Sequence, residues 1–128
     1  MKKLALTIVC ALGLAGAAAA DPAEGTWKTE VDDGAYAYVQ MYACGAKVCG
    51  KIARTFNGTG EYNSPNLGKA IVINMQPNGN GSYNGQVWRP SNNKIYIGKM
   101  SLNGNKIKLK GCVAGGLLCS AQDWTRVN

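Results

Sequence analysis

Four cysteines beyond residue 20 constrain the fold of this chain more than any other feature. They form two close pairs beside glycines, Cys44-Gly45 with Cys49-Gly50 and Gly111-Cys112 with Cys119. In a small chain that is exported to an oxidising compartment, this pattern predicts two disulfides. The N-terminal residues, which determine the compartment, therefore decide how the cysteines are interpreted.

The N-terminus has the three regions of an export signal. A short basic start precedes an apolar run over residues 4–16, and Ala17–Ala20 provide the small residues that a signal peptidase requires before Asp21. The apolar run is shorter than the about 20 residues that cross a bilayer, so no membrane span is expected. We predict that residues 1–20, with Cys10, are removed. Residues 21–128 then form one periplasmic or secreted domain.

The four remaining cysteines allow three pairings. Pairing within each close pair closes short loops, worth about 2 to 2.5 kcal/mol in the chain-entropy model. Pairing between the close pairs closes loops of about 70 residues, worth about 4.4 kcal/mol, so entropy does not decide between stabilising alternatives. Facing residues of a hairpin lie within bridging range, so we expect Cys44–Cys49 and Cys112–Cys119. Zinc requires reduced thiolates, which export disfavours, so no metal site is expected.

Segments of alternating or β-branched residues fill the chain beyond residue 20, separated by turns rich in glycine and asparagine. Over residues 35–44 one face carries tyrosines and Gln40, and the other carries alanines, Val39 and Met41. Asn103-Gly104 is the strongest hairpin signal. The strand rules predict eight strands, over residues 25–30, 35–44, 48–56, 70–75, 82–88, 95–102, 106–112 and 117–127.

This succession predicts an all-β fold, a small antiparallel up-and-down barrel of about eight strands. Closing the sheet removes exposed edges and leaves an interior for side chains or one small ligand. An open sandwich is the alternative, because Gly85 and Gly98 within strands are compatible with barrel bends and with bulges. Residues 57–68 are long enough to form a mobile loop or lid.

The residue types present argue against enzymatic activity. The sequence has no histidine, so it lacks the commonest general base and the commonest metal ligand. Its serines therefore have no histidine to activate them, and Asp32 and Asp33 are adjacent in a turn, where short polar side chains hold backbone groups. We expect no enzymatic activity and no cofactor.

The chain beyond the signal is mildly basic. Without Lys2 and Lys3, 12 basic residues remain against 7 acidic residues, a charge of about +5. Lys106, Lys108 and Lys110 alternate with apolar residues and so share one outer strand face, which solvation explains. An exported protein is not expected to meet nucleic acid, whereas anionic envelope components remain compatible partners.

An ordered series of short motifs resembles the DUF2147 family of small exported bacterial proteins. The series covers essentially the whole chain after residue 20: Gly25-x-Trp27, Tyr42-Ala-Cys44-Gly45, Val48-Cys-Gly-Lys-Ile52, Trp88-Arg-Pro90, Lys94-Ile-Tyr-Ile-Gly98, Lys110-Gly-Cys112 and Trp124-Thr-Arg126. The resemblance implies a lipocalin-like β-barrel in the envelope with no established enzymatic activity. In lipocalins a Trp closes one barrel end beneath an Arg, which implies that Trp27 and Arg126 form such a plug. Asn92-Asn93 departs from the family's usual Asp-Gly turn.

The strand positions expected to face inward define a candidate ligand site. Methionines adapt to ligands of different shape, while Trp88 and Tyr96 would offer polar groups at the mouth. We therefore expect a non-catalytic barrel that binds a small, mainly apolar or amphipathic molecule. If the interior is instead a packed core, the alternative is a module that binds a protein, such as an enzyme, or an envelope polymer through its surface. Monomer and homodimer both remain open. The predicted lining residues are Val39, Met41, Ile52, Ile73, Val87, Trp88, Tyr96, Met100, Ile107 and Leu109.

Overall fold

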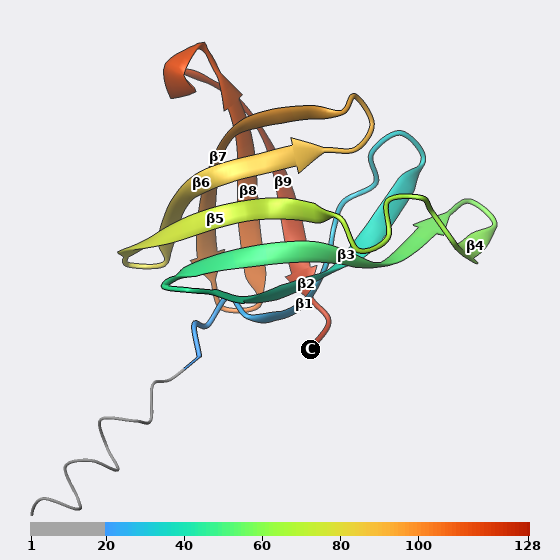
Figure 1. Cartoon of the computed structure of the whole chain (residues 1–128), viewed down its shortest axis with the longest axis horizontal. Coiled ribbons are helices and arrows are strands. Elements are labelled where there is room, and N and C mark those ends of the chain that lie inside the picture. The colour runs from blue at the N-terminus through green and yellow to red at the C-terminus, as the bar shows by residue number, and fades with distance from the viewer. Residues whose placement is uncertain (1–19) are drawn as a thin grey trace, which may run out of the picture.

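Eight antiparallel strands close into a barrel, and a ninth, very short strand extends its rim (Figure 1). The computed structural model describes residues 20–128, so the predicted signal peptide lies almost entirely outside the described residues and stays a prediction. The strands are β1 (Gly25–Lys28), β2 (Ala35–Cys44), β3 (Lys47–Asn57), β4 (Gly60–Tyr62), β5 (Ala70–Gly79), β6 (Ser82–Arg89), β7 (Lys94–Asn103), β8 (Lys106–Val113) and β9 (Leu118–Arg126).

Strand pairing confirms the predicted barrel rather than the open sandwich. The sheet order is β2-β1-β9-β8-β7-β6-β5-β3-β4, and β2 also pairs with β3, which closes the cylinder. All of the pairings are antiparallel between neighbours around the barrel. Closure gives each of the eight barrel strands two partners and so leaves none of them as a free edge.

The up-and-down course gathers the connections at two ends of the barrel. We call the end that carries the β1–β2, β3–β5, β6–β7 and β8–β9 connections the mouth end, and the end that carries the other turns and Asn128 the closed end (Figure 1). One disulfide lies at each end, Cys44–Cys49 at the closed end and Cys112–Cys119 at the mouth end, with Cα separations of 5.8 and 4.1 Å. Both follow the expected local pairing.

The segment expected to be a lid forms a small hairpin instead of an irregular loop. β4 pairs with the end of β3, so that Thr55 lies opposite Tyr62. The Thr55 hydroxyl donates to the Tyr62 carbonyl at 2.5 Å, and Arg54 forms a bidentate ion pair with Glu61, with a shortest distance of 2.6 Å. Local sequence indicated only a long loop, because three-residue strands carry too few positions to show alternation.

Glycines at matched positions of β6, β7 and β8 allow the barrel wall to bend. Gly85 pairs with Gly98, which in turn pairs with Gly111. A Cβ atom at Gly85 would lie 2.6 Å from the carbonyl oxygens of Ile73 and Asn74, where the β5–β6 register is shifted. The irregular part of β5 therefore packs directly on a strand position that only glycine can occupy without a backbone shift.

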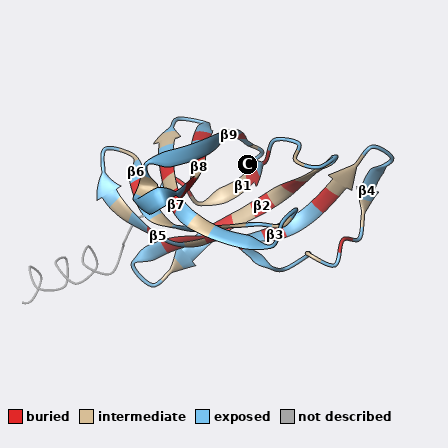
Figure 2. Cartoon of the chain, turned by 90° about the horizontal axis from the view of Figure 1, so that it is seen from above, coloured by how far each residue is buried: buried red, intermediate tan, exposed pale blue. Residues whose placement is uncertain are grey.

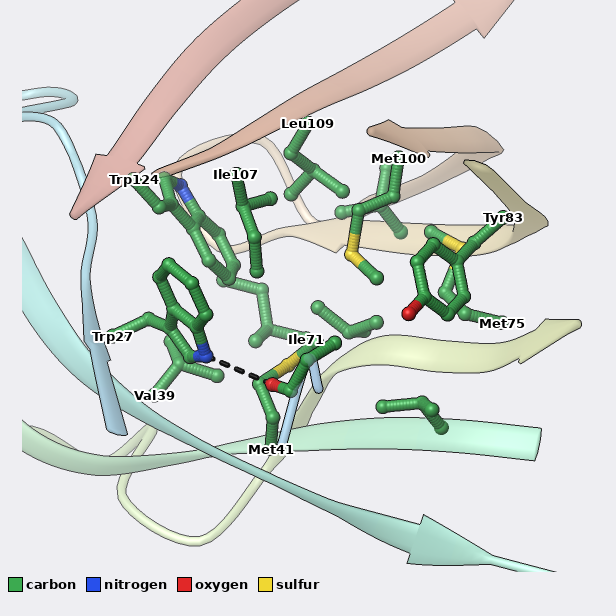
Figure 3. Packing of buried hydrophobic residues seen from close by; sticks show 14 of the residues in the cluster. Trp27, Val39, Met41, Ile71, Met75, Tyr83, Met100, Ile107, Leu109 and Trp124 are labelled. Atoms are coloured by element: carbon green, nitrogen blue, oxygen red, sulfur yellow. Dashed lines mark hydrogen bonds between the residues drawn. The ribbon is translucent and has the colours of Figure 1, made fainter. Parts of the chain in front are cut away.

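The interior toward the closed end is a packed apolar core. Buried positions alternate with more exposed ones along β2, as expected for a strand with one inner face (Figure 2). Figure 3 shows sulfur-containing side chains lying between the two buried tryptophans and the ring of Tyr83. Among the described residues, no helix is long and apolar enough to cross a membrane. The largest fully buried side chains are Trp27, Trp124, Met41, Met75, Met100 and Ile107.

Candidate functional site

The half of the barrel interior nearer the mouth end is hollow, and this hollow opens at the mouth end. The cavity has a volume of about 470 Å³, within the range of small-molecule sites. Its deeper wall is apolar and comes from strands on all sides of the barrel: Ala37, Ile52, Ile71, Val87, Leu109 and Trp124. The barrel thus combines two arrangements, a packed core at one end and a cavity at the other.

Half of the predicted lining residues border this cavity: Ile52, Val87, Trp88, Tyr96 and Leu109. Four others lie in the packed core instead, because the closed end of the barrel is filled by large side chains: Val39, Met41, Met100 and Ile107. Alternation identifies the inner face of a strand but gives no depth along the barrel axis, so it does not separate these two groups.

Ile73 is half-buried and does not line the cavity, whereas its neighbours Ile71 and Val72 are buried. The run Ala70–Met75 is apolar at nearly every position, so its sequence has no alternation that distinguishes its two faces. The backbone supplies the distinction. Asn74 has a φ of +49°, and the pairing of β5 with β6 shifts register after Ile73.

The cavity lining also includes positions on β9 that sequence reasoning did not select. Ser120, Gln122 and Trp124 follow one another at every second residue and all line the cavity. The Trp124 indole donates to the Gln122 side chain at 2.9 Å. A period-two pattern over these three residues was the available signal, but the polar Ser and Gln made this face resemble an outer one.

A buttressed ion pair crosses part of the mouth. Arg89 donates to the Asp32 carboxylate through Nε at 2.9 Å and through Nη2 at 2.8 Å, and the Ser91 hydroxyl adds a contact of 3.2 Å. These donors link the β1–β2 loop to the β6–β7 turn. The hydrogen bond from Arg89 holds the pKa of Asp32 below its ordinary value, against the opposing effect of partial burial. Asp32 therefore contributes a fixed negative charge at the rim.

Trp88 and Tyr96 stand at the mouth, where the sequence placed them, but their polar atoms are already engaged within the β6–β7 turn. The Trp88 indole donates to the Asn93 side chain at 2.9 Å, and the Asn92 amide donates to the Tyr96 hydroxyl at 2.7 Å. The turn at Asn92-Asn93 thus orients both rings. Both rings line the cavity, and the Trp88 N–H is already bonded within the turn.

The hairpin that carries β4 supplies a polar side to the mouth. Tyr62, Ser64 and Asn66 line the cavity, as does Thr55 on β3. The segment is anchored back to the barrel, since the Gly68 amide donates to the Ile52 carbonyl at 2.8 Å and the Ile52 amide donates to the Lys69 carbonyl at 3.0 Å.

The structure brings Trp27 and Arg126 together at the closed end. Trp27 is fully buried, and its indole donates to the Ala23 carbonyl at 2.9 Å. Arg126 donates to the carbonyls of Pro22 and Glu24 at 2.7 and 3.0 Å, and so holds the N-terminal segment across the barrel end. Gly25 is required here, because its φ is +125° and a Cβ atom would lie 2.5 Å from the Asn128 carbonyl oxygen.

Tyr83 also closes this end from the inside. Its ring is buried beside Met100, and its hydroxyl donates to the Asp21 carboxylate. Burial, followed by the hydrogen bond to Asp21, raises the pKa of Tyr83 well above its ordinary value. The hydroxyl therefore stays protonated and keeps the first residues of the domain fixed.

The arrangement offers binding rather than an evident centre for acid–base chemistry. Asp32 is held by Arg89, and the Glu30 carboxylate accepts a hydrogen bond from the backbone amide of Asp123. Within residues 20–128 the structure contains no group of three or more His, Cys, Asp or Glu side chains that could hold a metal ion. An apolar cavity with a polar rim is suited to a molecule that has one apolar part and one polar part.

Comparison with known proteins agrees with this description of the fold. The family model DUF2147, described as an uncharacterized protein conserved in bacteria, matches residues 25–126. A solved structure described as protein HP1028 from the human pathogen Helicobacter pylori, which belongs to the lipocalin family, superposes with a TM-score of 0.65 at 15% sequence identity. The match covers 82% of each chain. Comparison with curated protein sequences finds no match.

Proposed function

This chain belongs to the DUF2147 family and has a lipocalin-like fold, and from that premise we propose that its barrel binds a small, mainly apolar or amphipathic molecule without transforming it. The cavity of about 470 Å³ is the observation that carries the proposal. A fold alone does not specify a function, so the argument rests on this site.

The lining suggests how such a molecule would be oriented. Its apolar part would lie against Ile52, Val87 and Leu109, where burial of apolar surface provides the main favourable free energy. Its polar part would remain at the rim, near Asp32 and Arg89. The local disulfides support the further proposal that the protein works outside the cytoplasm, in the periplasm or after secretion.

Native mass spectrometry of the exported protein tests this proposal first. An additional mass that is present in the native protein and lost on denaturation would reveal the bound molecule and its class. A bare mass would be followed by titration with dodecanoic acid, monitored by tryptophan fluorescence, because Trp88 and Trp124 line the cavity. The absence of both a retained mass and a fluorescence response would contradict the proposal.

A cavity-filling variant makes the titration specific. A Cβ atom at Gly111 would make contacts of 3.4 Å with Tyr96 and Val87, so Gly111→Leu is expected to project into the cavity without a backbone clash. We expect dodecanoic acid affinity to fall by about ten-fold or more. Lys106→Val is the matched control, because it changes an exposed outer position of the same strand. Equal affinity for Gly111→Leu and the unmodified protein would place binding outside the cavity.

The alternative function, binding of a protein or an envelope polymer through the surface, requires no cavity. A hollow mouth end therefore favours the small-molecule proposal over it. Affinity capture from envelope extract separates the two. A stoichiometric protein partner whose binding survives Gly111→Leu would favour the alternative, since that substitution leaves the outer surface unchanged.

A further inference from the structure

Exposed aliphatic side chains gather at the mouth end of the barrel. They lie on several separate connections, and the β8–β9 connection contributes the most exposed of them. Toward the closed end, Tyr42 and Val127 are less exposed than all of these side chains except Leu67. Exposed apolar groups that cluster in this way mark contact with a protein or a membrane. The mouth-end group consists of Val31, Leu67, Ile95, Val113, Leu117 and Leu118.

The β8–β9 connection forms a projecting apolar tip. Leu117 is 86% exposed and Leu118 is 66% exposed. The Cys112–Cys119 disulfide fixes the base of the connection, and Lys99 donates to the Gly116 carbonyl at 3.2 Å. In Figure 1 the connection rises clear of the barrel wall. Two neighbouring leucines are thus held in water by a constrained backbone.

The strand that leads into this tip, β8, and its neighbour β7 carry several lysines and little opposing charge. Lys94 stands at the mouth-end start of β7, and the outer wall formed by β7 and β8 carries Lys99 and Lys110 in addition to Lys106 and Lys108. On the neighbouring β9, the Asp123 carboxylate is paired with Lys108 at 3.1 Å. Among the described residues, Lys94, Lys99 and Lys110 form no ion pair. Lysines near an anionic bilayer contribute to binding, and aliphatic side chains inserted beside them add to it.

We propose that the mouth end of the barrel docks onto an anionic phospholipid bilayer. Leu117 and Leu118 insert below the headgroups, and Lys94, Lys99 and Lys110 contact the headgroup phosphates. A bilayer fits this surface better than a protein partner, because the apolar side chains stand on separate connections around an opening instead of forming one flat patch. Docking in this orientation turns the cavity mouth toward the lipid. The proposal does not depend on what the cavity holds.

Vesicle flotation of the exported protein tests the docking. We expect the protein to float with vesicles of equimolar phosphatidylglycerol and phosphatidylcholine, and to bind pure phosphatidylcholine at least about ten-fold more weakly. Binding to the anionic vesicles should weaken as salt is raised, because salt screens the lysines. Failure to float with the anionic vesicles at low salt would overturn the proposal.

Paired variants locate the surface. Leu117→Ser combined with Leu118→Ser should lower the bound fraction by about ten-fold or more, since each leucine loses its apolar contact. Val127→Ser changes an exposed apolar residue at the closed end and should have no effect. Lys94→Gln with Lys110→Gln should remove the preference for anionic vesicles, whereas Lys47→Gln with Lys51→Gln should preserve it.

The remaining outcomes also decide the question. A leucine variant that floats like the unmodified protein overturns the proposal, provided that both proteins melt at the same temperature. The proposal is also overturned if the unmodified protein does not float with vesicles and instead forms a dimer in analytical ultracentrifugation, while the leucine variant stays a monomer. Dodecanoic acid binding, measured separately, reports on the cavity alone, so failure of docking and failure of the proposed function are distinguishable.

Discussion

The guanidinium carbon of Arg126 lies 4.3 Å from the ring centroid of Trp27, directly over the face of a fully buried indole. The same guanidinium donates to two backbone carbonyls of the N-terminal segment and to the Asn105 side chain. One side chain therefore joins the first strand, the last strand, the β7–β8 turn and the segment that precedes β1. Its removal should affect the whole closed end.

Arg126→Met should lower the free energy of unfolding by about 2 kcal/mol, because it removes the cation–π contact and leaves the carbonyls of Pro22 and Glu24 without their donors. Urea denaturation followed by far-UV circular dichroism measures this. Arg54→Met is the control, since Arg54 also lies over aromatic rings but is largely exposed, and its loss should destabilise the fold clearly less than Arg126→Met. Equal losses would mean that Arg126 has no special role.

Two glycines that face each other across β7 and β8 should respond oppositely to alanine. A Cβ atom at Gly98 would lie 2.9 Å from the backbone carbonyl carbon of Gln86, so Gly98→Ala should destabilise the fold by about 1 to 3 kcal/mol. Gly111 has room for a Cβ, and Gly111→Ala should be neutral or stabilising by about 0.5 kcal/mol. Thermal denaturation of both variants tests this, and the reverse order would contradict the packing described.

The two disulfides should contribute similarly to stability but differently to binding. Replacing either pair with alanines should lower the free energy of unfolding by about 2 kcal/mol, as expected for short loops. Loss of Cys112–Cys119 should also weaken dodecanoic acid binding, because Ser120 and Ala121 beside it line the cavity. Loss of Cys44–Cys49, at the closed end, should leave affinity unchanged. Equal effects on affinity would show that the mouth-end disulfide does not shape the site.

The contribution of the Asp32–Arg89 ion pair to stability should disappear in acid. Because the pKa of Asp32 is lower in the folded chain than its ordinary value of 3.8, the pair stabilises the fold above that pH and this stabilisation is lost as the pH falls below it. Asp32→Asn should therefore destabilise the protein by about 0.5 kcal/mol at pH 7 and have little effect near pH 2.

Urea denaturation at both pH values compares the variant with the unmodified protein. The difference between the two proteins is the informative quantity, because other groups titrate in the same range. Glu61, whose pKa is lowered by its hydrogen bonds from Arg54, contributes equally to both proteins and cancels. A difference that is unchanged in acid would contradict the role given to Asp32.

Local sequence patterns determined most of the architecture. Alternation in residues 35–44 predicted the inner face of β2, where Ala37, Val39 and Met41 are buried. Asn103-Gly104 predicted the turn between β7 and β8, and the close cysteine pairs predicted local bridges. These features depend on residues near one another in the chain, so their signals survive in the sequence alone.

Only the tertiary structure decided where the interior is packed and where it is hollow. Met41 and Leu109 are both buried at inner positions, yet only Leu109 also borders the cavity. Likewise, the pairing of Asp32 with Arg89 joins residues 57 positions apart, and nothing in the local sequence relates them. Depth along the barrel axis depends on how all eight strands tilt and meet, and this is fixed only when β2 pairs with β3 and the barrel closes.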